Sequence, residues 1–303
     1  MEIEISKLAT LTGHQGPLYV LANEQEGSKF YSGGSDKLVV EWDLNNPTEP
    51  KVIAKSQFVI YSLLYIKQNN VLLIGNNQGG IHVIDLILKT EIHYFDAHVN
   101  GVFCMYYLPT ENRILTGGGD GQYILWNAAD FKVFKKEKIS NGKIRSIAIN
   151  EFKNIIAISS GEKEVFIYNL KTFERLYSFE AHTDAVNAVQ FDKNADFLFT
   201  GAKDAYLKIW NVANGFELVK EIPAHNYAIY SIQFNYDGKL FATASRDKTI
   251  KIWETEGFNL LKRIDKEQFD GHANSVNQLI WSTSENKLTS CSDDGKLMIW
   301  KIN

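Results

Sequence analysis

The sequence contains little cysteine or proline and no long apolar run. Only two of its 303 residues are cysteine and only five are proline. Cys104 and Cys291 lie in separate apolar, strand-like runs, so we interpret them as buried free thiols in a reducing compartment. No apolar run reaches the ~18 residues that cross a bilayer, and the first residues lack the basic start and apolar core of a signal peptide. We therefore expect a cytoplasmic protein, with the nucleus as the alternative location, and no membrane partner.

A large excess of charge of one sign is also missing. The 32 basic side chains nearly balance the 36 acidic ones, and the formal net charge is −4. This balance argues against nucleic acid or an anionic membrane as the main partner. No Gly/Ser-rich linker or long run of like charge marks a domain boundary. Apolar residues make up 45% and charged residues 22% of the chain, which is typical of a soluble, packed protein.

A repeat runs through the chain. Five aspartates each precede a tryptophan by six residues, and a histidine that follows Gly or Ala stands 22 residues before each of these aspartates. The tryptophans are at positions 42, 126, 210, 253 and 300, which leaves two gaps of 84 residues, twice 42. Units that end at Ile84 and Tyr168 would fill these gaps. The spacing therefore predicts seven units of about 42 residues.

Each unit contains short runs that read as β-strands. In the first unit, "LYVLAN", "KFYSGG" and "LVVEW" are rich in β-branched and aromatic residues, with period-2 alternation in the third run. A weaker run follows the tryptophan, such as "VFKKEK" in the third unit. Four short strands in about 42 residues predict one blade of a propeller.

On these marks the sequence resembles the WD-repeat family, over nearly its whole length. The resemblance implies an all-β fold, a seven-bladed β-propeller of four-stranded antiparallel blades, in a single domain of residues 1–303. The chain stops directly after a third strand, in "LMIWKIN", whereas residues 2–11, Glu2 to Leu11, form a spare strand before the first unit. The resemblance implies that this N-terminal strand completes the last blade, which removes an open seam between the first and last blades.

The resemblance also implies that a histidine, a hydroxyl residue, an aspartate and a tryptophan form a hydrogen-bonded tetrad inside each blade. A buried indole N–H needs an acceptor, and a buried carboxylate needs donors. Neither a catalytic triad nor a metal site fits, because the set occurs five times and its histidines are one per blade. The predicted tetrads are His14, Ser32, Asp36 and Trp42; His98, Thr116, Asp120 and Trp126; His182, Thr200, Asp204 and Trp210; His225, Thr243, Asp247 and Trp253; and His272, Ser290, Asp294 and Trp300.

The second and fourth units have lost all four tetrad residues together. The register positions hold Ser56, Ile74, Gln78 and Ile84 in the second unit, and Ser140, Ile158, Glu162 and Tyr168 in the fourth. Joint loss is expected if the four residues work as a set, because a single survivor would lack its partner. We expect these two blades to be tied less well by polar groups and to depend more on apolar packing.

Partners of this family commonly dock on the narrower top face of the propeller. The resemblance places three positions per blade on that face: three and five residues after the histidine, and one before the aspartate. These positions are rich in aromatic and basic residues, the usual anchors of binding interfaces. They predict a partner segment with an apolar anchor and an acidic or phosphorylated flank. The alternative is that the aromatics only plug the channel mouth. The predicted partner-binding residues are Tyr19, Tyr61, Phe103, Lys143, Arg145, Lys203, Tyr230 and Arg246.

The sequence therefore predicts a non-catalytic scaffold or adaptor, without cofactor or metal, that binds proteins or peptides. We expect it to be a monomer by itself and a subunit of a multiprotein complex. A propeller-type hydrolase or lyase is the first alternative, but such sites need several acids, histidines or a metal, and the top positions offer one acid, Asp293. An RNA-binding propeller is the second, and two or three cations on an acidic protein give it little support.

Overall fold

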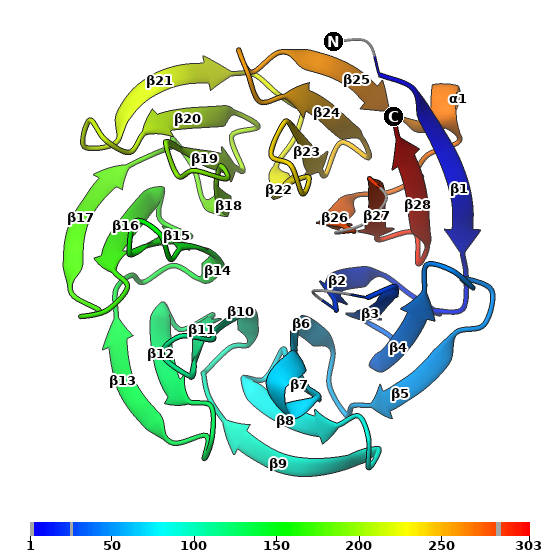
Figure 1. Cartoon of the computed structure of the whole chain (residues 1–303), viewed down its shortest axis with the longest axis vertical. Helices are drawn as coiled ribbons and strands as arrows, with labels where there is room; N and C mark the ends of the chain where they lie inside the picture. The colour runs from blue at the N-terminus through cyan, green and yellow to red at the C-terminus, as the bar shows by residue number, and fades with distance from the viewer. Residues whose placement is uncertain (1–2, 25–26, 283–285) are drawn as a thin grey trace. The chain divides into compact units, whose positions relative to one another are not determined.

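Seven four-stranded antiparallel sheets make up the fold. The computed structural model describes residues 3–24, 27–282 and 286–303, and these ranges contain twenty-eight strands, the short helix α1 (Lys266–Phe269) and the 3-10 turn η1 (Lys67–Asn69). By contacts, the chain divides into two compact units, one of Met1–Ile60 with His225–Asn303 and the other of Tyr61–Ala224. Figure 1 shows the strands of each sheet side by side. The predicted fold class, all-β with seven four-stranded antiparallel blades, is confirmed.

The first unit contains three sheets, which are numbered by their order in the chain. Within a sheet, the strands pair in chain order: the first with the second, the second with the third and the third with the fourth. In sheet seven the fourth strand is β1, from the N-terminal end of the chain. Their strands are β2 (Leu18–Asn23), β3 (Lys29–Gly34), β4 (Leu38–Asp43) and β5 (Lys51–Lys55) in sheet one; β22 (Ile229–Phe234), β23 (Leu240–Ser245), β24 (Ile250–Glu254) and β25 (Leu260–Ile264) in sheet six; and β26 (Val276–Trp281), β27 (Lys287–Ser292), β28 (Leu297–Ile302) and β1 (Ile5–Leu11) in sheet seven.

The second unit contains sheets two to five, with the same strand order. The strands are β6 (Ile60–Ile66), β7 (Val71–Asn76), β8 (Gly80–Asp85) and β9 (Thr90–Asp96) in sheet two; β10 (Val102–Leu108), β11 (Arg113–Gly118), β12 (Gln122–Asn127) and β13 (Val133–Lys138) in sheet three; β14 (Ile144–Asn150), β15 (Ile155–Ser160), β16 (Glu164–Asn169) and β17 (Arg175–Glu180) in sheet four; and β18 (Val186–Phe191), β19 (Phe197–Ala202), β20 (Leu207–Asn211) and β21 (Glu217–Ile222) in sheet five.

The N-terminal strand completes sheet seven, as predicted. β1 pairs antiparallel with β28, from Ile5 opposite Ile302 to Leu11 opposite Leu297, with one irregularity between Lys7 and Ala9. The prediction began this strand at Glu2, which lies outside the described residues. The last sheet thus joins the two ends of the chain, and β28 has a partner on both sides.

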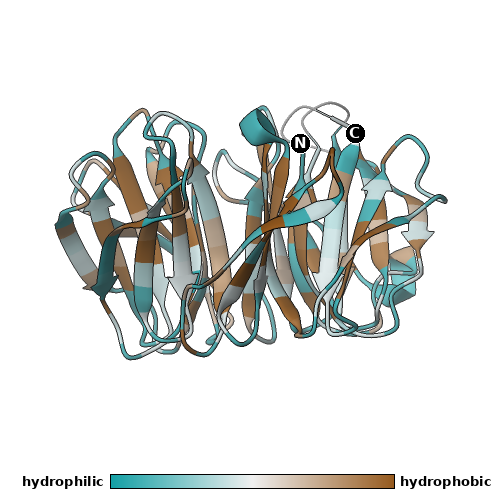
Figure 2. Cartoon of the chain, turned by 90° about the horizontal axis from the view of Figure 1, so that it is seen from below, coloured by the Kyte–Doolittle hydropathy of each residue, from teal (hydrophilic) through white to brown (hydrophobic). Residues whose placement is uncertain are grey.

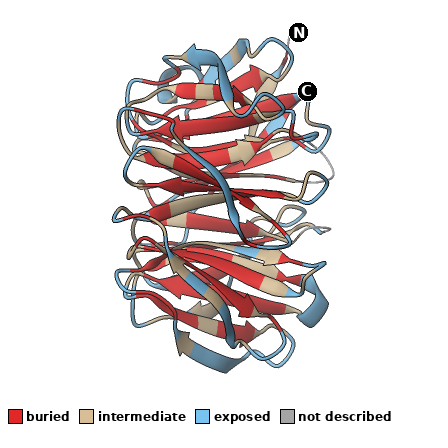
Figure 3. Ribbon diagram, turned by 90° about the vertical axis from the view of Figure 1, so that its left-hand side faces the viewer, coloured by how far each residue is buried: buried red, intermediate tan, exposed pale blue. Residues whose placement is uncertain are grey.

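Burial follows the position of a strand within its sheet. Every residue of β7, β15 and β23, the second strands of sheets two, four and six, is buried, whereas the outer strands β9, β17 and β21 are largely exposed. Figure 2 shows apolar bands along the strands, and Figure 3 shows exposed residues mainly in loops and outer strands. Strands buried on both faces read as continuous apolar runs rather than alternating ones, as "VLLIG" does in β7.

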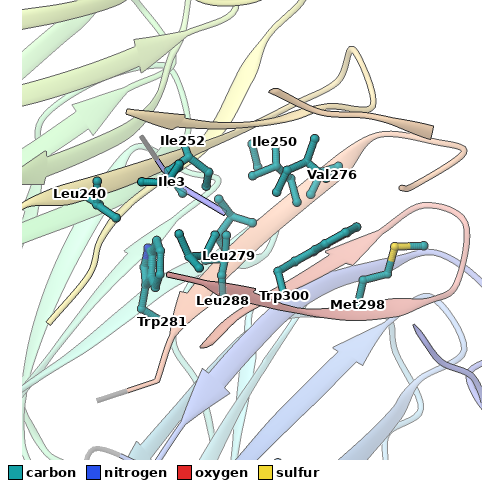
Figure 4. Packing of buried hydrophobic residues seen from close by; sticks show 14 residues of the cluster. Ile3, Leu240, Ile250, Ile252, Val276, Leu279, Trp281, Leu288, Met298 and Trp300 are labelled. Atoms are coloured by element: carbon teal, nitrogen blue, oxygen red, sulfur yellow. The ribbon is translucent and has the colours of Figure 1, made fainter. Parts of the chain in front are cut away.

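The core consists of apolar layers between successive sheets within each unit. The cluster in Figure 4 joins sheet six to sheet seven through residues such as Ile252 and Leu279. Trp281, which lies outside the predicted tetrads, belongs to this layer, and its Nε1 donates to the carbonyl oxygen of Gln233 at 3.1 Å. In the second unit, similar layers lie between sheets two and three, three and four, and four and five. Face-to-face packing of this kind holds the ends of the first strands in fixed places.

Candidate functional site

The predicted tetrad of sheet one forms a continuous chain of hydrogen bonds. Trp42 Nε1 donates to Ser32 Oγ at 2.7 Å, Ser32 Oγ lies 2.8 Å from His14 Nε2, and His14 Nδ1 lies 2.7 Å from Asp36 Oδ2. One arrangement of protons satisfies every group: the hydroxyl donates to Nε2, and Nδ1–H donates to the carboxylate.

The structure brings the same four residue types together in sheets three, five, six and seven. In these sheets the hydroxyl oxygen lies 2.7 to 2.8 Å from the histidine Nε2, the indole nitrogen lies 2.9 to 3.1 Å from the hydroxyl, and the histidine Nδ1 lies 2.9 to 3.1 Å from the aspartate. The hydroxyl residues are fully buried, so no substrate can reach them: Ser32, Thr116, Thr200, Thr243 and Ser290.

Four tetrad aspartates have a lowered pKa and are held in the charged form: Asp120, Asp204, Asp247 and Asp294. Burial opposes ionisation of Asp120, but hydrogen bonds from His98 and from the backbone N–H of Val99 outweigh it and lower its pKa to about 2. The pKa of Asp204 is lowered to about 2 by the balance of burial against its bonds from His182 and nearby backbone groups. Each carboxylate therefore ties a turn to the histidine of the same sheet.

Sheet four replaces its missing tetrad with a shorter polar network. Ser140 Oγ donates to Glu162 Oε2 at 2.8 Å and also lies 2.8 Å from Ser160 Oγ. The backbone N–H of Asn141 donates to the same carboxylate oxygen at 2.9 Å. Hydrogen bonding from Ser140 and Asn141 lowers the pKa of Glu162. Ser140 and Glu162 stand at the histidine and aspartate positions, so they keep the tie between the two loops although both residues have changed.

Tyr168, at the tryptophan position of sheet four, is buried and has a different partner. Its hydroxyl donates to Glu137 Oε1 at 3.2 Å, and the hydroxyl of Tyr123 donates to Glu137 Oε2 at 2.7 Å. Burial, followed by the charge of Glu137, raises the pKa of Tyr168. Polar groups therefore link β13 of sheet three to β16 of sheet four, in addition to the apolar layer between the two sheets.

The position of Glu137 in the repeat explains this link. Its equivalents on the outer strands β9 and β17 are Phe95 and Phe179, which lie 42 residues before and after it. Those rings pack on the tryptophans of the following sheets, Phe95 on Trp126 at 4.6 Å and Phe179 on Trp210 at 4.7 Å between ring centroids. In the contact between sheets three and four, Glu137 thus takes the place of the phenylalanine and Tyr168 takes the place of the tryptophan. Comparison of the outer strands at this register could have predicted the pair.

Sheet two depends on an asparagine that the sequence reading missed. Asn76 is fully buried, and its Oδ1 accepts hydrogen bonds from the backbone N–H groups of Gln78, Gly79 and Gly80 at 2.9 to 3.2 Å. Asn76 thus stabilises the turn between β7 and β8, and in the tetrad sheets an aspartate stabilises the corresponding turn. Its Nδ2 has no hydrogen-bond partner among the residues that the structure describes.

Four of the predicted partner-binding residues form one cluster in the second unit. Tyr61 on β6 and Phe103 on β10 are stacked, with ring centroids 5.1 Å apart and planes 21° apart. Lys143 Nζ and Arg145 Cζ lie 5.1 and 5.2 Å from the Phe103 centroid. Tyr61, Phe103 and Arg145 are the second residues of the first strands of sheets two, three and four. We call these four residues the aromatic–cation cluster.

The cluster carries two positive charges beside one ring. Within the described part of the chain, Lys143 forms no ion pair and is exposed. Lys203, another predicted binding residue of this unit, has its Nζ 3.1 Å from Asp184 Oδ2, so its charge is largely neutralised. The charge of Lys203 is thus paired with an acid, whereas Lys143 forms no ion pair in the described ranges.

The other three predicted residues lie in the first unit. Tyr19 is the second residue of β2 and Tyr230 the second of β22, and both are half-buried. Arg246 is exposed, and its Cζ lies 5.9 Å from the ring centroid of Tyr227, a residue that is 59% exposed. Tyr227 was not predicted, because it follows its histidine by two residues, a position outside the three considered.

These sheets and tetrads define a repeat protein of the β-propeller class. The family model "WD domain, G-beta repeat" matches residues 5–43, 89–127, 173–211, 216–254 and 264–301. The matched segments cover more than half of the chain, so the chain belongs to the WD-repeat family. They are the five units with complete tetrads, and the second and fourth units fall between them.

Curated proteins with WD repeats are similar at low identity. The chain is 22% identical to a WD repeat-containing protein 91 homolog of Dictyostelium discoideum over 62% of this chain and 26% of that protein. It is 20% identical to striatin of Rattus norvegicus, over 69% and 30%, and 26% identical to WD repeat-containing protein srw1 of Schizosaccharomyces pombe, over 68% and 38%. The matches thus span less than two fifths of each relative.

No helix among the described residues has the length and apolarity needed to cross a membrane. In the same ranges, no group of three or more His, Cys, Asp or Glu side chains is placed to hold a metal ion.

Proposed function

We propose that this protein is a non-catalytic scaffold that binds a protein or peptide segment at the ends of its blades. The proposed contacts are Tyr19, Tyr61, Phe103, Lys143, Arg145, Lys203, Tyr230 and Arg246. The segment carries an apolar anchor with an acidic or phosphorylated flank. The aromatic–cation cluster is the observation that supports this proposal best, because it places two stacked aromatic rings beside the guanidinium group of Arg145 and beside the ammonium group of Lys143, which forms no ion pair among the described residues.

The cluster has the physical properties of a binding hot spot. Tyrosine and phenylalanine supply large contact areas with few rotatable bonds, and tyrosine and arginine are enriched among the residues that dominate the energetics of interfaces. Phe103 and Arg145 belong to strands, so their backbones are already fixed before binding. The stacked ring of Tyr61 and the two cations restrict the Phe103 side chain further. Pre-organised side chains lose less entropy on binding, which raises affinity.

The remaining features support a scaffold rather than an enzyme. The tetrad hydroxyls are buried and bonded to histidines that are themselves bonded to aspartates. Asp293, the one acid among the predicted top positions, accepts a hydrogen bond from Asn277 Nδ2 at 2.7 Å. We further propose a cytoplasmic or nuclear protein that is monomeric alone and joins a multiprotein complex. The free thiols Cys104 and Cys291 agree with a reducing compartment.

The test is affinity capture with a variant of the cluster. Tyr61→Ala combined with Arg145→Glu should lose the proteins that co-purify with the wild type while keeping its melting temperature. The matched control is Phe152→Ala with Lys171→Glu, which changes an exposed ring and an exposed cation at the other ends of the sheet four strands. Identical partner sets for the wild type and the cluster variant, with an unchanged melt, would remove the proposal.

A further inference from the structure

We infer that the outer edge of sheet two binds an extended, basic segment of a partner protein as a fifth strand. This edge is the strand β9, and Figure 1 shows it on the outer side of sheet two. The strand β6, which carries Tyr61, forms the opposite edge of the sheet. The surface is therefore separate from the aromatic–cation cluster, and the inference does not depend on the proposed function.

The strand β9 lacks the cations that the other outer strands carry. Edge strands are usually protected by charged side chains, above all by lysine, which discourage pairing with a further strand. The other six outer strands each contain at least one lysine or arginine, whereas β9, with the sequence "TEIHYFD", contains neither. Six of its seven residues are exposed, and no described strand pairs with its outer side. The backbone of this edge is therefore open to pairing.

The pairing of β9 with β8 is regular over four residues. His93 to Asp96 lie opposite Val83 to Gly80, and Ile92, next along β9, has no residue opposite it on β8. The other six outer strands also have one such irregularity each, so it does not distinguish β9. An added segment can form regular ladder bonds with residues 93–96 and extend its side chains past the irregularity.

Contacts with sheet three hold the regular part of β9 in place. His93 stacks on Phe131 with ring centroids 5.2 Å apart, and Phe95 packs on the tryptophan of sheet three. Tyr94, between them, lies on the opposite face of the strand, where its ring centroid is 4.8 Å from that of His82. Because the edge is fixed before binding, a segment that pairs with it orders little of this protein.

The turn before β9 carries an apolar pair that the turn itself does not need. Asp85 Oδ1 accepts hydrogen bonds from the backbone N–H groups of Ile87 and Leu88 at 2.8 Å each. The two apolar residues are 73% and 67% exposed. At the equivalent turns, 42, 84 and 126 residues later, the pairs are Ala129 and Asp130, Lys171 and Thr172, and Ala213 and Asn214. Together with the exposed Ile92, the pair gives this end of the edge the apolar surface that marks interaction sites.

The charges of the edge favour a basic segment. Glu91 and Asp96 belong to β9, and no lysine or arginine pairs with either of them among the described residues. Glu91 Oε2 lies 2.8 Å from His82 Nδ1, and the hydroxyl of Tyr94 donates to Asp96 Oδ1 at 2.8 Å. Lys89 lies outside the strand, in the preceding turn. Opposite charges on paired strands stabilise a sheet, so lysine or arginine on the added strand would meet these carboxylates favourably.

The same charges disfavour a second copy of this chain at the edge. Pairing of two β9 strands would bring two copies each of Glu91 and Asp96 together, with no lysine or arginine on either strand. Like charges on paired strands are destabilising. A segment that alternates basic and β-branched residues fits better, because its cations meet the carboxylates and its apolar side chains meet Ile92 and the apolar turn.

The experiment measures the binding of three nine-residue peptides by the intact protein. The first alternates valine and lysine and begins and ends with valine. The second has glutamate in place of lysine, and the third is the first with its central valine replaced by proline, which interrupts a strand ladder. We expect the first peptide to bind at least about tenfold more tightly than either of the others, because it alone combines strand pairing with opposite charge. Its binding should slow amide hydrogen exchange in residues 93–96.

Matched variants locate the site. Ile92→Lys adds a cation to the exposed edge and should weaken binding at least about fivefold without changing the melting temperature. Leu176→Lys makes the same change at the equivalent, exposed position of β17, 84 residues later, and should bind like the wild type. Glu91→Gln combined with Asp96→Asn should remove the preference for the basic over the acidic peptide.

Four results would overturn the inference. The first is a valine–lysine peptide that does not bind, and the second is a proline peptide that binds as tightly as its parent, which would show charge attraction without strand pairing. The third is binding that Ile92→Lys leaves unchanged or that Leu176→Lys weakens equally. The fourth is a concentration-dependent dimer of the wild type that Ile92→Lys abolishes, because the edge would then belong to a second copy of the chain.

Discussion

The hydroxyl of Tyr168 donates a hydrogen bond to the carboxylate of Glu137 at 3.2 Å. This bond joins sheet four to sheet three at the position where neighbouring pairs of sheets pack a phenylalanine on a tryptophan. Both members of the contact have changed together, from apolar rings to a polar pair. Sheet four, which lacks the family's tetrad, is therefore linked to sheet three by a specific polar contact.

A double-mutant cycle tests this tie. Tyr168→Phe removes one hydrogen bond to a charged, half-buried carboxylate, and should lower the free energy of unfolding by about 1.5–3 kcal/mol. Combined with Glu137→Gln, the loss should be smaller than the sum of the two single losses by about 0.5 kcal/mol or more, because both changes break one interaction. Urea unfolding of the four proteins measures the coupling. Strict additivity would show that the contact contributes nothing.

The tetrads should contribute more than the apolar position that replaces them. Trp253→Phe removes the indole N–H that donates to Thr243 Oγ1 at 3.0 Å, and should cost about 1–3 kcal/mol of stability. A conservative change at the equivalent position of sheet two, Ile84→Val, should cost less, because it removes one methylene and breaks no hydrogen bond. Thermal unfolding of both variants tests the difference. Equal losses at the two sites would contradict a special role for the tetrad.

The lowered pKa of Asp120 predicts acid sensitivity. The pKa of Asp120 in the folded protein is about 2, whereas an unfolded aspartate has a value near 3.9. Between these two pKa values the folded state therefore binds fewer protons than the unfolded state. The stabilisation contributed by Asp120 is fully present above the unfolded pKa and is lost as the pH falls from about 4 to about 2. Asp120→Asn should show a shallower decline over this window in urea unfolding midpoints. A decline as steep as that of the wild type would contradict the assignment.

Neutralisation of Lys203 by Asp184 predicts unequal roles for two predicted binding cations. Lys143→Gln should weaken partner binding several-fold and reduce its dependence on salt, because it removes a charge with no ion pair among the described residues. Lys203→Gln combined with Asp184→Asn removes a pair that is already neutral and should change binding less than twofold. Titration of a captured partner at two salt concentrations provides the comparison. Equal weakening of binding by both variants would show that Lys203 contributes to partner binding as much as Lys143 does.

The sequence predicts the sheets well because each tetrad residue marks a fixed point of a blade. His98 and Asp120 lie 22 residues apart because they close the same two loops of sheet three. Spacing alone therefore gave the number of blades, including the two without tetrads. The tetrad spacing does not predict the partners of Glu137 and Asn76, because each residue lies in a blade or at a contact where the tetrad pattern is broken. The Glu137 pair emerges only when the outer strands are compared at the same register, and Asn76 has no such signal.

The candidate site was predictable as a set of positions but not as a set of contacts. The 42-residue spacing places Tyr61, Phe103 and Arg145 at one register, and successive blades bring that register together. The register does not predict that Lys143 and Arg145 lie beside the ring of Phe103 or that Lys203 pairs with an acid. These contacts depend on rotamers and on side chains outside the register. Asp184, which follows its histidine by two residues, is such a side chain, and so is Tyr227.

Removal of the N-terminal strand should unfold more than the strand itself. β1 covers the outer edge of β28, and Leu11 is buried in the layer between sheets seven and one. Deletion of residues 1–11 would leave the backbone of β28 unpaired on that side and expose apolar surface, which promotes pairing with other chains. We expect a markedly lower melting temperature and aggregation, both reversed by adding a peptide of residues 1–13. Leu8→Ser, which changes an exposed position of the same strand, is the control and should melt like the wild type. A truncated protein that remains monomeric and melts normally would show that sheet seven is stable with three strands, and would leave the pairing of the two chain ends without a stabilising role.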